Sequence, residues 1–298
     1  MIKRTLLFEN PVYLSQKLDQ LIVKYQDDGI PGRSVPIEDI GLVILEHAQI
    51  TISHFLMNKL IEKNVAVITC DLQHLPSGML LPLNTHSAQS ERIKHQINAS
   101  IPLKKNLWQQ TVIAKIRNQK IHLLKRGIPC AKFEQWEKDV RSGDSLNHES
   151  RAAVFYWNYL FGKNEFIRDQ FGLPPNNLLN YGYSILRGIT ARAIVGSGML
   201  PILGIFHKNK YNAYCLADDI MEPYRIYVDL LVCEILDSGQ NIENLNSELK
   251  QKLLKIATVD VLIEGKKSPL LNAISRTTNS LFECFEGTSR KILYPVLE

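Results

Sequence analysis

The sequence predicts an α+β protein in which a small N-terminal β-rich domain, residues 1–84, precedes a larger, mostly α-helical C-terminal domain, residues 85–298. Two observations predict this class. Residues 1–84 contain short runs rich in Val, Ile, Leu and Tyr, separated by turn residues. From Ser87 onward, apolar residues instead recur at helical spacing with few breaks. Such a change of period is typical of a boundary between two domains.

In the N-terminal domain, four segments have the composition of β-strands. They are KRTLLF (3–8), VYLSQKLDQLIVKY (12–25), GLVILE (41–46) and VAVITC (65–70). Ser53 is a candidate N-cap of a short helix, because the apolar residues that follow it share one helical face: Phe55, Leu56, Leu60 and Ile61.

Turn residues divide the C-terminal domain into its predicted helices. The breaks are Gly127-Ile128-Pro129, Ser142-Gly143-Asp144, Gly172-Leu173-Pro174-Pro175 and Gly198. The sequence shows no internal repeat and no low-complexity tract.

Composition excludes several classes of protein. The net charge of +5 permits a polyanionic partner without requiring one. The cysteines are five in number and scattered, with no C-x-x-C pair, so we expect neither a disulfide framework nor a thiolate zinc site: Cys70, Cys130, Cys215, Cys233 and Cys284. The apolar run in MIKRTLLFENP is too short for a signal peptide, and none approaches the ~20 residues that span a bilayer. We expect a soluble cytoplasmic protein without membrane contact.

The entry to the helical domain is strongly basic. Between Ser87 and Arg126 the only acid is Glu91, against nine basic residues: Arg92, Lys94, Lys104, Lys105, Lys115, Arg117, Lys120, Lys125 and Arg126. This pattern is typical of a solvated helix face, and it also suits a phosphate backbone. Trp108, within the stretch, is expected to pack in the core rather than stack on a base.

The segment NHESRAAVFYWNYLFG (147–162) predicts a helix with a carboxylate on its inward side. The inward stripe consists of Ala152, Ala153, Tyr156 and Leu160. Glu149 belongs to the same stripe, and an ionised carboxylate that faces a core needs a partner, a shifted pKa or a metal. The alternative is an exposed first turn in which Asn147 caps the helix and Glu149 complements its dipole.

A second cluster of polar residues lies in HKNKYNAYCLADDIMEPYRIYVD (207–229). His207 follows the apolar stretch GMLPILGIF (198–206). Asp219 and Glu222 are three residues apart and share one helix face, whereas Asp218 points elsewhere. Pro223 leaves the start of this helix open.

Together, Glu149 and Glu222 supply two carboxylates and His207 supplies one imidazole. Hard oxygen donors with one nitrogen and no cysteine suit Mg²⁺ or Mn²⁺ better than a structural zinc. His207 is more readily a metal ligand than an acid–base group, and this alternative stays open.

Several motifs, in order along nearly the whole chain, resemble the CRISPR-associated integrase of spacer acquisition, the first of the two universal adaptation proteins (the Cas-one family), most closely its type II members. The motifs are PIEDIG (36–41), AVITCD (66–71), QSER (89–92), PLKKNLWQQ (102–110), ESRAAVFYW (149–157), LNYGYSILRG (179–188), GMLPILGIFH (198–207) and LADDIMEPYR (216–225).

The resemblance implies an N-terminal β domain and a helical domain with one divalent metal site. The family's metal-binding glutamate falls on Glu149, its histidine on His207 and its last acidic ligand on Glu222, with Mg²⁺ or Mn²⁺ as the cofactor. Asp219 matches a further acidic position that supports catalysis. Glu222 is aspartate in some branches of the family, which keeps the donor type.

The resemblance also implies the reaction and the partners. The 3′-hydroxyl of a captured double-stranded DNA fragment attacks a phosphodiester at the edge of a CRISPR repeat, and with water as nucleophile the same site is an endonuclease. The family works as a homodimer, with a dimer of the second universal adaptation protein (Cas-two) and, in type II systems, the RNA-guided effector nuclease. Expected DNA contacts are Arg92, Lys104, Lys105, Tyr183, Arg187 and Arg225.

Two other functions stay open at this point. The basic helices and the β domain also suit a non-catalytic DNA-binding scaffold whose acids only cap helices. A metal-dependent hydrolase of small molecules is the weaker alternative, because it leaves the basic stretch without a role.

Overall fold

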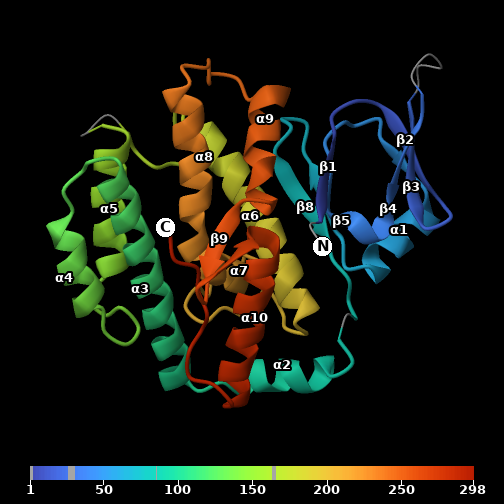
Figure 1. Cartoon of the computed structure of the whole chain (residues 1–298). Coiled ribbons are helices and arrows are strands. Elements are labelled where there is room, and N and C mark those ends of the chain that lie inside the picture. Colours follow the sequence, from blue (N-terminus) through green and yellow to red (C-terminus); the bar gives the residue numbers. More distant parts are fainter. Residues whose placement is uncertain (1–2, 26–30, 85, 163–165) are drawn as a thin grey trace. The chain divides into compact units, whose positions relative to one another are not determined.

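The structure, a computed structural model, describes residues 3–25, 31–84, 86–162 and 166–298. The predicted α+β class is confirmed: strands assembled into sheets form the N-terminal part, and helices dominate the rest (Figure 1). The chain divides into two compact units, Met1–Ser87 and Ala88–Glu298. The boundary predicted from the sequence falls at residue 85, which lies outside the described residues.

The first unit contains two four-stranded sheets. One has the order β1 (Arg4–Phe8), β5 (Ile40–Leu45), β7 (Ala66–Cys70) and β8 (Pro76–Leu80), with the first three parallel and β8 antiparallel. The other has the order β4 (Arg33–Pro36), β3 (Gln20–Tyr25), β2 (Val12–Lys17) and β6 (Thr51–Ile52). A 3₁₀ turn, η1 (Ile37–Asp39), joins β4 to β5.

The core of the first unit follows from strand alternation. Leu14 of β2 and Leu21 of β3 point inward and are fully buried. Helix α1 (His54–Glu62) adds Leu56 and Leu60 to the same cluster. The predicted cap is confirmed, since Ser53 accepts a hydrogen bond from the Leu56 amide at 3.3 Å.

The prediction of one strand over residues 12–25 is wrong, because the segment is a hairpin. β2 and β3 pair antiparallel, and the turn between them is made by Leu18 and Asp19, whose φ angles are 51° and 55°. A two-residue turn with both φ angles positive matches the twist of a hairpin, but it normally carries Asn or Gly. The sequence therefore lacks the usual signal. The short strands β4, β6 and β8 were also not predicted.

The second unit is a helical assembly around the long helix α6 (Asn176–Gly196), whose residues are almost all buried (Figure 1). The predicted breaks are confirmed, as all four lie between helices. The remaining helical elements are α2 (Gln89–Asn98), α3 (Ile101–Lys125), α4 (Ala131–Asp139), α5 (His148–Leu160), α7 (Cys215–Met221), η2 (Glu222–Tyr224), α8 (Arg225–Asp237), α9 (Ser247–Leu254), η3 (Lys255–Ala257) and α10 (Leu270–Glu286). Helix α6 packs against α7, α8, α9 and α10.

A small hairpin interrupts the helical unit. β9 (Asp260–Ile263) and β10 (Lys266–Pro269) pair antiparallel. The turn uses Glu264 and Gly265, with φ angles of 51° and 70°. Helical spacing over the whole region from Ser87 was therefore too broad a prediction.

Helix α3 is the element against which the candidate site is built. It contacts α5, which carries Glu149, and the segment α7–η2–α8, which carries Asp219 and Glu222. Its N-terminus is fixed by Ser100, which accepts a hydrogen bond from the Leu103 amide at 3.3 Å. Among the helices that the structure describes, none has the length and apolar character needed to cross a membrane.

Candidate metal centre

Glu149 lies in the first turn of α5, and the preceding loop fixes its position. Asp144 accepts hydrogen bonds from the amides of His148 at 3.0 Å and Glu149 at 2.9 Å. The alternative in which Asn147 caps this helix is wrong in one respect. Asn147 occupies the N-cap position with φ of 53°, but its side chain makes no capping bond. The Glu149 carboxylate is instead free to turn toward α3, where it pairs with Lys115.

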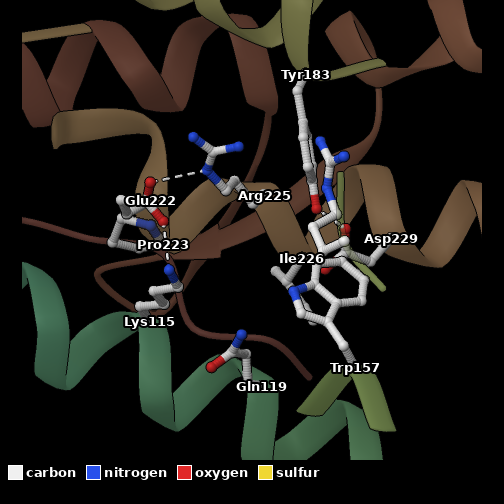
Figure 2. A pocket seen from close by; sticks show the side chains of 10 residues that line it. Lys115, Gln119, Trp157, Tyr183, Glu222, Pro223, Arg225, Ile226 and Asp229 are labelled. Atoms are coloured by element: carbon white, nitrogen blue, oxygen red, sulfur yellow. Dashed lines mark hydrogen bonds and ion pairs between the residues drawn. The ribbon is translucent and has the colours of Figure 1, made fainter. Parts of the chain in front are cut away.

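Glu222 lies at the junction between α7 and α8, in the short 3₁₀ turn η2. Its side chain is 8% exposed. One carboxylate oxygen, Oε1, accepts a hydrogen bond from Arg225 Nε at 2.9 Å, and Oε2 lies 2.6 Å from Lys115 Nζ (Figure 2). Burial alone raises the pKa of this carboxyl group, but the charges of Arg225 and Lys115 outweigh it and lower the pKa to about 2. Glu222 is therefore ionised at neutral pH.

Glu149 and Glu222 thus contact the same ammonium group. They come from two elements that are far apart in sequence, and both turn toward the middle of α3. The Lys115 side chain is 10% exposed. Burial lowers the pKa of Lys115, but Glu222 and Glu149 raise it further, so the net shift is upward and the lysine stays charged. The expectation that Lys115 belongs to a solvated helix face is wrong.

His207 is held in place by Asp219. Asp219 is fully buried, and its Oδ1 lies 2.5 Å from His207 Nδ1. The Asp219 carboxylate also accepts the backbone amides of Ile205 at 2.7 Å, Phe206 at 3.0 Å and His207 at 3.2 Å. Four donors therefore surround one carboxylate. The hydrogen bond that His207 donates to Asp219 raises the pKa of His207 above its usual value, and the charges of Asp219 and Glu222 add to the effect.

Gly204 allows the chain to wrap this closely around Asp219. A Cβ atom at Gly204 would lie 2.4 Å from the His207 carbonyl oxygen and 2.8 Å from Asp219 Oδ2. The wrapped loop is also held from α3, because the indole of Trp108 stacks on Phe206 at 4.2 Å and meets the His207 ring edge-on at 5.7 Å. The prediction that Trp108 is a core residue is confirmed, since it is 2% exposed.

Asp218 points away from this cluster, as predicted from its spacing. Its Oδ1 accepts a hydrogen bond from Arg187 Nε at 2.6 Å, and its Oδ2 accepts one from Asn212 Nδ2 at 2.7 Å. Asp218 therefore anchors α6 and the loop after His207 rather than contributing a donor to the candidate centre.

The donors present fit a divalent cation in kind. Glu222 Oε2 is buried and lies 2.6 Å from the Lys115 ammonium. This ammonium is a stand-in cation between two carboxylates, and hard oxygen donors are what Mg²⁺ and Mn²⁺ prefer. As these side chains stand, however, no three His, Cys, Asp or Glu groups in the described part of the chain converge closely enough to hold an ion.

A cavity of about 170 Å³ adjoins Glu222 (Figure 2). Its wall includes Lys115 and Gln119 from α3 and Trp157 from α5. Tyr183 is 5% exposed and donates its hydroxyl to Asp229. The guanidinium groups of Arg225 and Arg168 lie 4.6 Å and 5.3 Å from the Tyr183 ring centre.

The predicted DNA-contacting residues separate into two groups and one further residue, Arg92. Tyr183, Arg187 and Arg225 lie together with Arg168 around a second, polar cavity of about 400 Å³. Lys104 and Lys105 lie on α3 in the turns before Lys115, and Lys105 is exposed. Arg92 is different: its Nη1 donates to the Ser197 carbonyl at 3.1 Å, and its guanidinium lies 3.9 Å from the Phe282 ring centre. A contact from Arg92 to phosphate is untested, and these contacts favour a structural role for Arg92 instead.

Sequence reasoning missed Lys115, Gln119, Arg168 and Asp229 as residues of this region. Lys115 and Gln119 are four residues apart on α3 and therefore share a face, but nothing in the local pattern marks that face as buried. Sequence reasoning also overestimated how many basic side chains between Ser87 and Arg126 are unpaired. Lys120 and Arg117 pair with Glu137 at 2.8 Å and 2.7 Å, and Arg126 pairs with Asp237 at 3.0 Å.

Comparison with known proteins identifies the family. The family model CRISPR associated protein Cas1 matches residues 5–264, which include Glu149, His207 and Glu222. The CRISPR-associated endonuclease Cas1 of Neisseria meningitidis serogroup C (strain 8013) is 36% identical over 282 residues, covering 94% of this chain and 91% of the relative.

Solved structures share the fold. A casposase bound to integration product superposes with a TM-score of 0.80 at 21% identity, covering 97% of this chain and 92% of that chain. A chain of a Cas6-RT-Cas1–Cas2 complex superposes with a TM-score of 0.74 at 20% identity, covering 100% of this chain and 36% of that one. From the match over residues 5–264 and the 36% identity, the chain belongs to the family of CRISPR associated protein Cas1.

Proposed function

We propose that this protein is a divalent-metal-dependent DNA integrase and endonuclease of CRISPR adaptation, which joins the 3′-hydroxyl ends of captured DNA fragments to the CRISPR repeat by transesterification. The observation that carries the proposal is that Glu149 and Glu222, from separate elements, contact one cation beside a cavity lined with basic side chains. Membership of the Cas1 family, and a relative that is named as an endonuclease, support it.

The residues we assign as ligands of Mg²⁺ or Mn²⁺ are Glu149, Glu222 and the Nε2 atom of His207. A bound ion of this kind neutralises the attacked phosphate and stabilises charge on the leaving oxygen. The chain's own part is to hold the donors ready. Asp219 accepts a hydrogen bond from Nδ1–H of His207, which leaves the lone pair of Nε2 for the ion. Arg225 holds one carboxylate oxygen of Glu222 in place by a hydrogen bond.

The DNA is held by the basic side chains around the cavities. Arg168, Arg187 and Arg225 present planar guanidinium groups, which suit phosphate oxygens. Lys104 and Lys105 extend the basic surface along α3. With a 3′-hydroxyl as nucleophile the centre joins two DNA strands, and with water it cleaves one, so integrase and endonuclease are two outcomes at one site.

The proposed partners are double-stranded DNA fragments, CRISPR repeat DNA, a second copy of this chain and a dimer of Cas2. The shared fold with chains bound to integration product and with a chain in a Cas1–Cas2 complex supports the DNA and Cas2 proposals. The homodimer and an association with the RNA-guided effector nuclease rest on the resemblance of the motifs to type II members alone.

The second candidate function is a non-catalytic DNA-binding scaffold subunit of an adaptation complex. The observation that favours it is that Lys115 already neutralises Glu149 and Glu222, so these carboxylates have partners without an ion.

Strand transfer with a Glu149→Gln variant separates the two functions. A labelled DNA fragment is incubated with a plasmid carrying the host's repeat in Mg²⁺ or Mn²⁺, with and without Cas2. We expect Glu149→Gln to lower the yield of joined product by roughly 100-fold or more. Glu137→Gln is the matched control, because Glu137 pairs with Arg117 and Lys120 outside the site and should retain activity. Full activity of Glu149→Gln would show that catalysis does not come from this site, whereas wild-type protein that binds the DNA but joins none of it, with or without Cas2, would leave only the scaffold.

A further inference from the structure

The cation between the two glutamates of the candidate site is a side chain of the protein, the ammonium group of Lys115. Lys115 projects from the middle of α3 toward Glu222 (Figure 2). Its ammonium contacts Glu149 as well. Within the described part of the chain, Arg225 forms an ion pair with Glu222 but none with Glu149. Lys115 is therefore the group that brings the two carboxylates together, and it stands where an ion shared by them would have to be.

The charges of this group balance without any ion. Two carboxylates, Glu149 and Glu222, face two basic groups, Lys115 and Arg225. Lys115 and Glu222 are buried and need such pairing, because an unpaired charge in a low-dielectric site is strongly unfavourable. A divalent ion added to the balanced group leaves two positive charges in excess. Phosphates of DNA are the natural source of the missing negative charge.

Gln119 provides an alternative hydrogen-bond acceptor for the Lys115 ammonium. Gln119 lies one helical turn further along α3 and lines the same cavity of about 170 Å³ (Figure 2). It is 5% exposed, and its Oε1 has no hydrogen-bond partner among the described residues. A buried acceptor without a donor is uncommon, and Gln119 lines the same cavity as Lys115.

We propose that Lys115 is a resident counter-ion which a divalent metal ion must displace. Its ammonium holds Glu149 and Glu222 together in the ion-free protein and moves toward Gln119 Oε1 when the ion binds. Ion binding then depends on bound DNA phosphate. This inference rests on the proposed function, since it concerns the regulation of the same site. It predicts reciprocal coupling, in which DNA tightens the ion and the ion tightens DNA.

The test is direct measurement of Mn²⁺ binding, by electron paramagnetic resonance, to the full chain alone and with a DNA duplex that ends in 3′-deoxynucleotides and cannot be joined. In the wild type we expect weak Mn²⁺ binding that DNA strengthens. Lys115→Met should bind Mn²⁺ roughly tenfold more tightly without DNA, and the added effect of DNA should shrink, where each tenfold change is about 1.4 kcal/mol.

Lys120→Met is the matched control, because Lys120 lies on the same helix and pairs with Glu137 instead. It should leave Mn²⁺ affinity unchanged. Mn²⁺ affinity in Lys115→Met that equals or falls below the wild-type value would overturn the inference. If Lys115→Met does not fold, Gln119→Leu carries the test: without its acceptor the displaced ammonium is disfavoured and Mn²⁺ should bind several-fold more weakly, whereas unchanged affinity would overturn the proposal.

The outcomes also separate this inference from the proposed function. Wild-type protein that binds no Mn²⁺ even with DNA would remove the metal centre itself. Wild-type binding that is lost in Glu149→Gln but unaltered in Lys115→Met would keep the metal centre and remove the counter-ion role of Lys115.

Discussion

His207 Nδ1 lies 2.5 Å from Asp219 Oδ1, and the same carboxylate accepts three consecutive backbone amides, those of residues 205 to 207. Asp219 therefore fixes the ring, its tautomer and the backbone that carries it. Because four donors already bond its two oxygens, we expect Asp219 to act through His207 rather than as a direct ligand of an ion. This arrangement matches the carboxylate–histidine pairs that orient metal-binding imidazoles in other proteins.

The first prediction concerns Asp219→Asn. An amide in place of the carboxylate has one acceptor oxygen, and its NH₂ group faces backbone N–H donors. We expect about 2–4 kcal/mol lower stability and 10- to 100-fold weaker metal binding, measured by thermal unfolding and calorimetry. Asp218→Asn is the neighbouring control, because Asp218 bonds Arg187 and Asn212, and it should keep the metal affinity. Equal metal affinity in Asp219→Asn and wild type would contradict a positioning role.

The second prediction concerns Gly204→Ala. A methyl group at this position meets the His207 carbonyl oxygen and Asp219 Oδ2 at distances shorter than van der Waals contact. The loop should open and His207 should shift, which lowers the melting temperature and the metal affinity together. The measurement is a metal titration followed by tryptophan fluorescence, since Trp108 contacts both Phe206 and His207. Melting and titration curves of Gly204→Ala that match those of the wild type would show that the close packing of the loop around Asp219 is not needed.

The third prediction compares Arg92→Ala with Lys105→Gln. The Arg92 guanidinium lies on Phe282 and bonds the Ser197 carbonyl, so its loss should lower stability by about 1–3 kcal/mol with little change in DNA binding. Lys105 is exposed, so its loss should leave stability nearly unchanged and reduce the slope of DNA affinity against salt concentration by about one charge. A larger change of salt slope in Arg92→Ala than in Lys105→Gln would restore Arg92 as a phosphate contact.

The fourth prediction is a pH dependence due to Asp229. This carboxyl group is 2% exposed. Burial raises its pKa from 3.8 to about 6, although the hydroxyls of Tyr183 and Tyr156 and the charge of Arg225 oppose the shift. Between about pH 4 and 6 the folded protein holds a proton that the unfolded chain has released, so the contribution of Asp229 to stability falls as the pH rises through this window.

Asp229→Asn removes that contribution. The free energy of unfolding of Asp229→Asn, relative to wild type, should therefore increase as the pH rises from 4 to 6, by up to about 3 kcal/mol, and should be constant above pH 7. Denaturant unfolding of both proteins at a series of pH values measures it. A difference that stays constant across the window, or decreases, is incompatible with the raised pKa.

Much of the fold was predictable because it depends on local spacing. Helices such as α1 and α5 carry an apolar stripe, and the breaks between helices carry Gly or Pro. The hairpin of β2 and β3 was missed because its turn is made by Leu18 and Asp19, residues without a strong turn signal. The hairpin of β9 and β10 was missed because four-residue strands give too little alternation to separate from helical spacing.

The candidate site was predictable only as a set of residue types. Glu149 and Glu222 stood out because carboxylates on otherwise apolar faces need a partner, and the structure brings both to Lys115. Their coordination of a metal stays a prediction. Lys115 itself was grouped with the surface lysines. Its partners lie on other elements, far away in the sequence, so the residues next to Lys115 give no signal of the pairing. Which lysines are buried is decided by packing of α3 against α5 and η2.

The most direct test of the account is the position of Mn²⁺ in crystals of the protein soaked with that ion, seen by its anomalous scattering. We predict one strong peak at about 2.2 Å from a carboxylate oxygen of Glu149, one of Glu222 and Nε2 of His207, with the Lys115 ammonium moved away and Asp219 still bonded to Nδ1 of His207. A peak at another place, or no peak while Lys115 keeps both glutamates, would contradict the proposed centre.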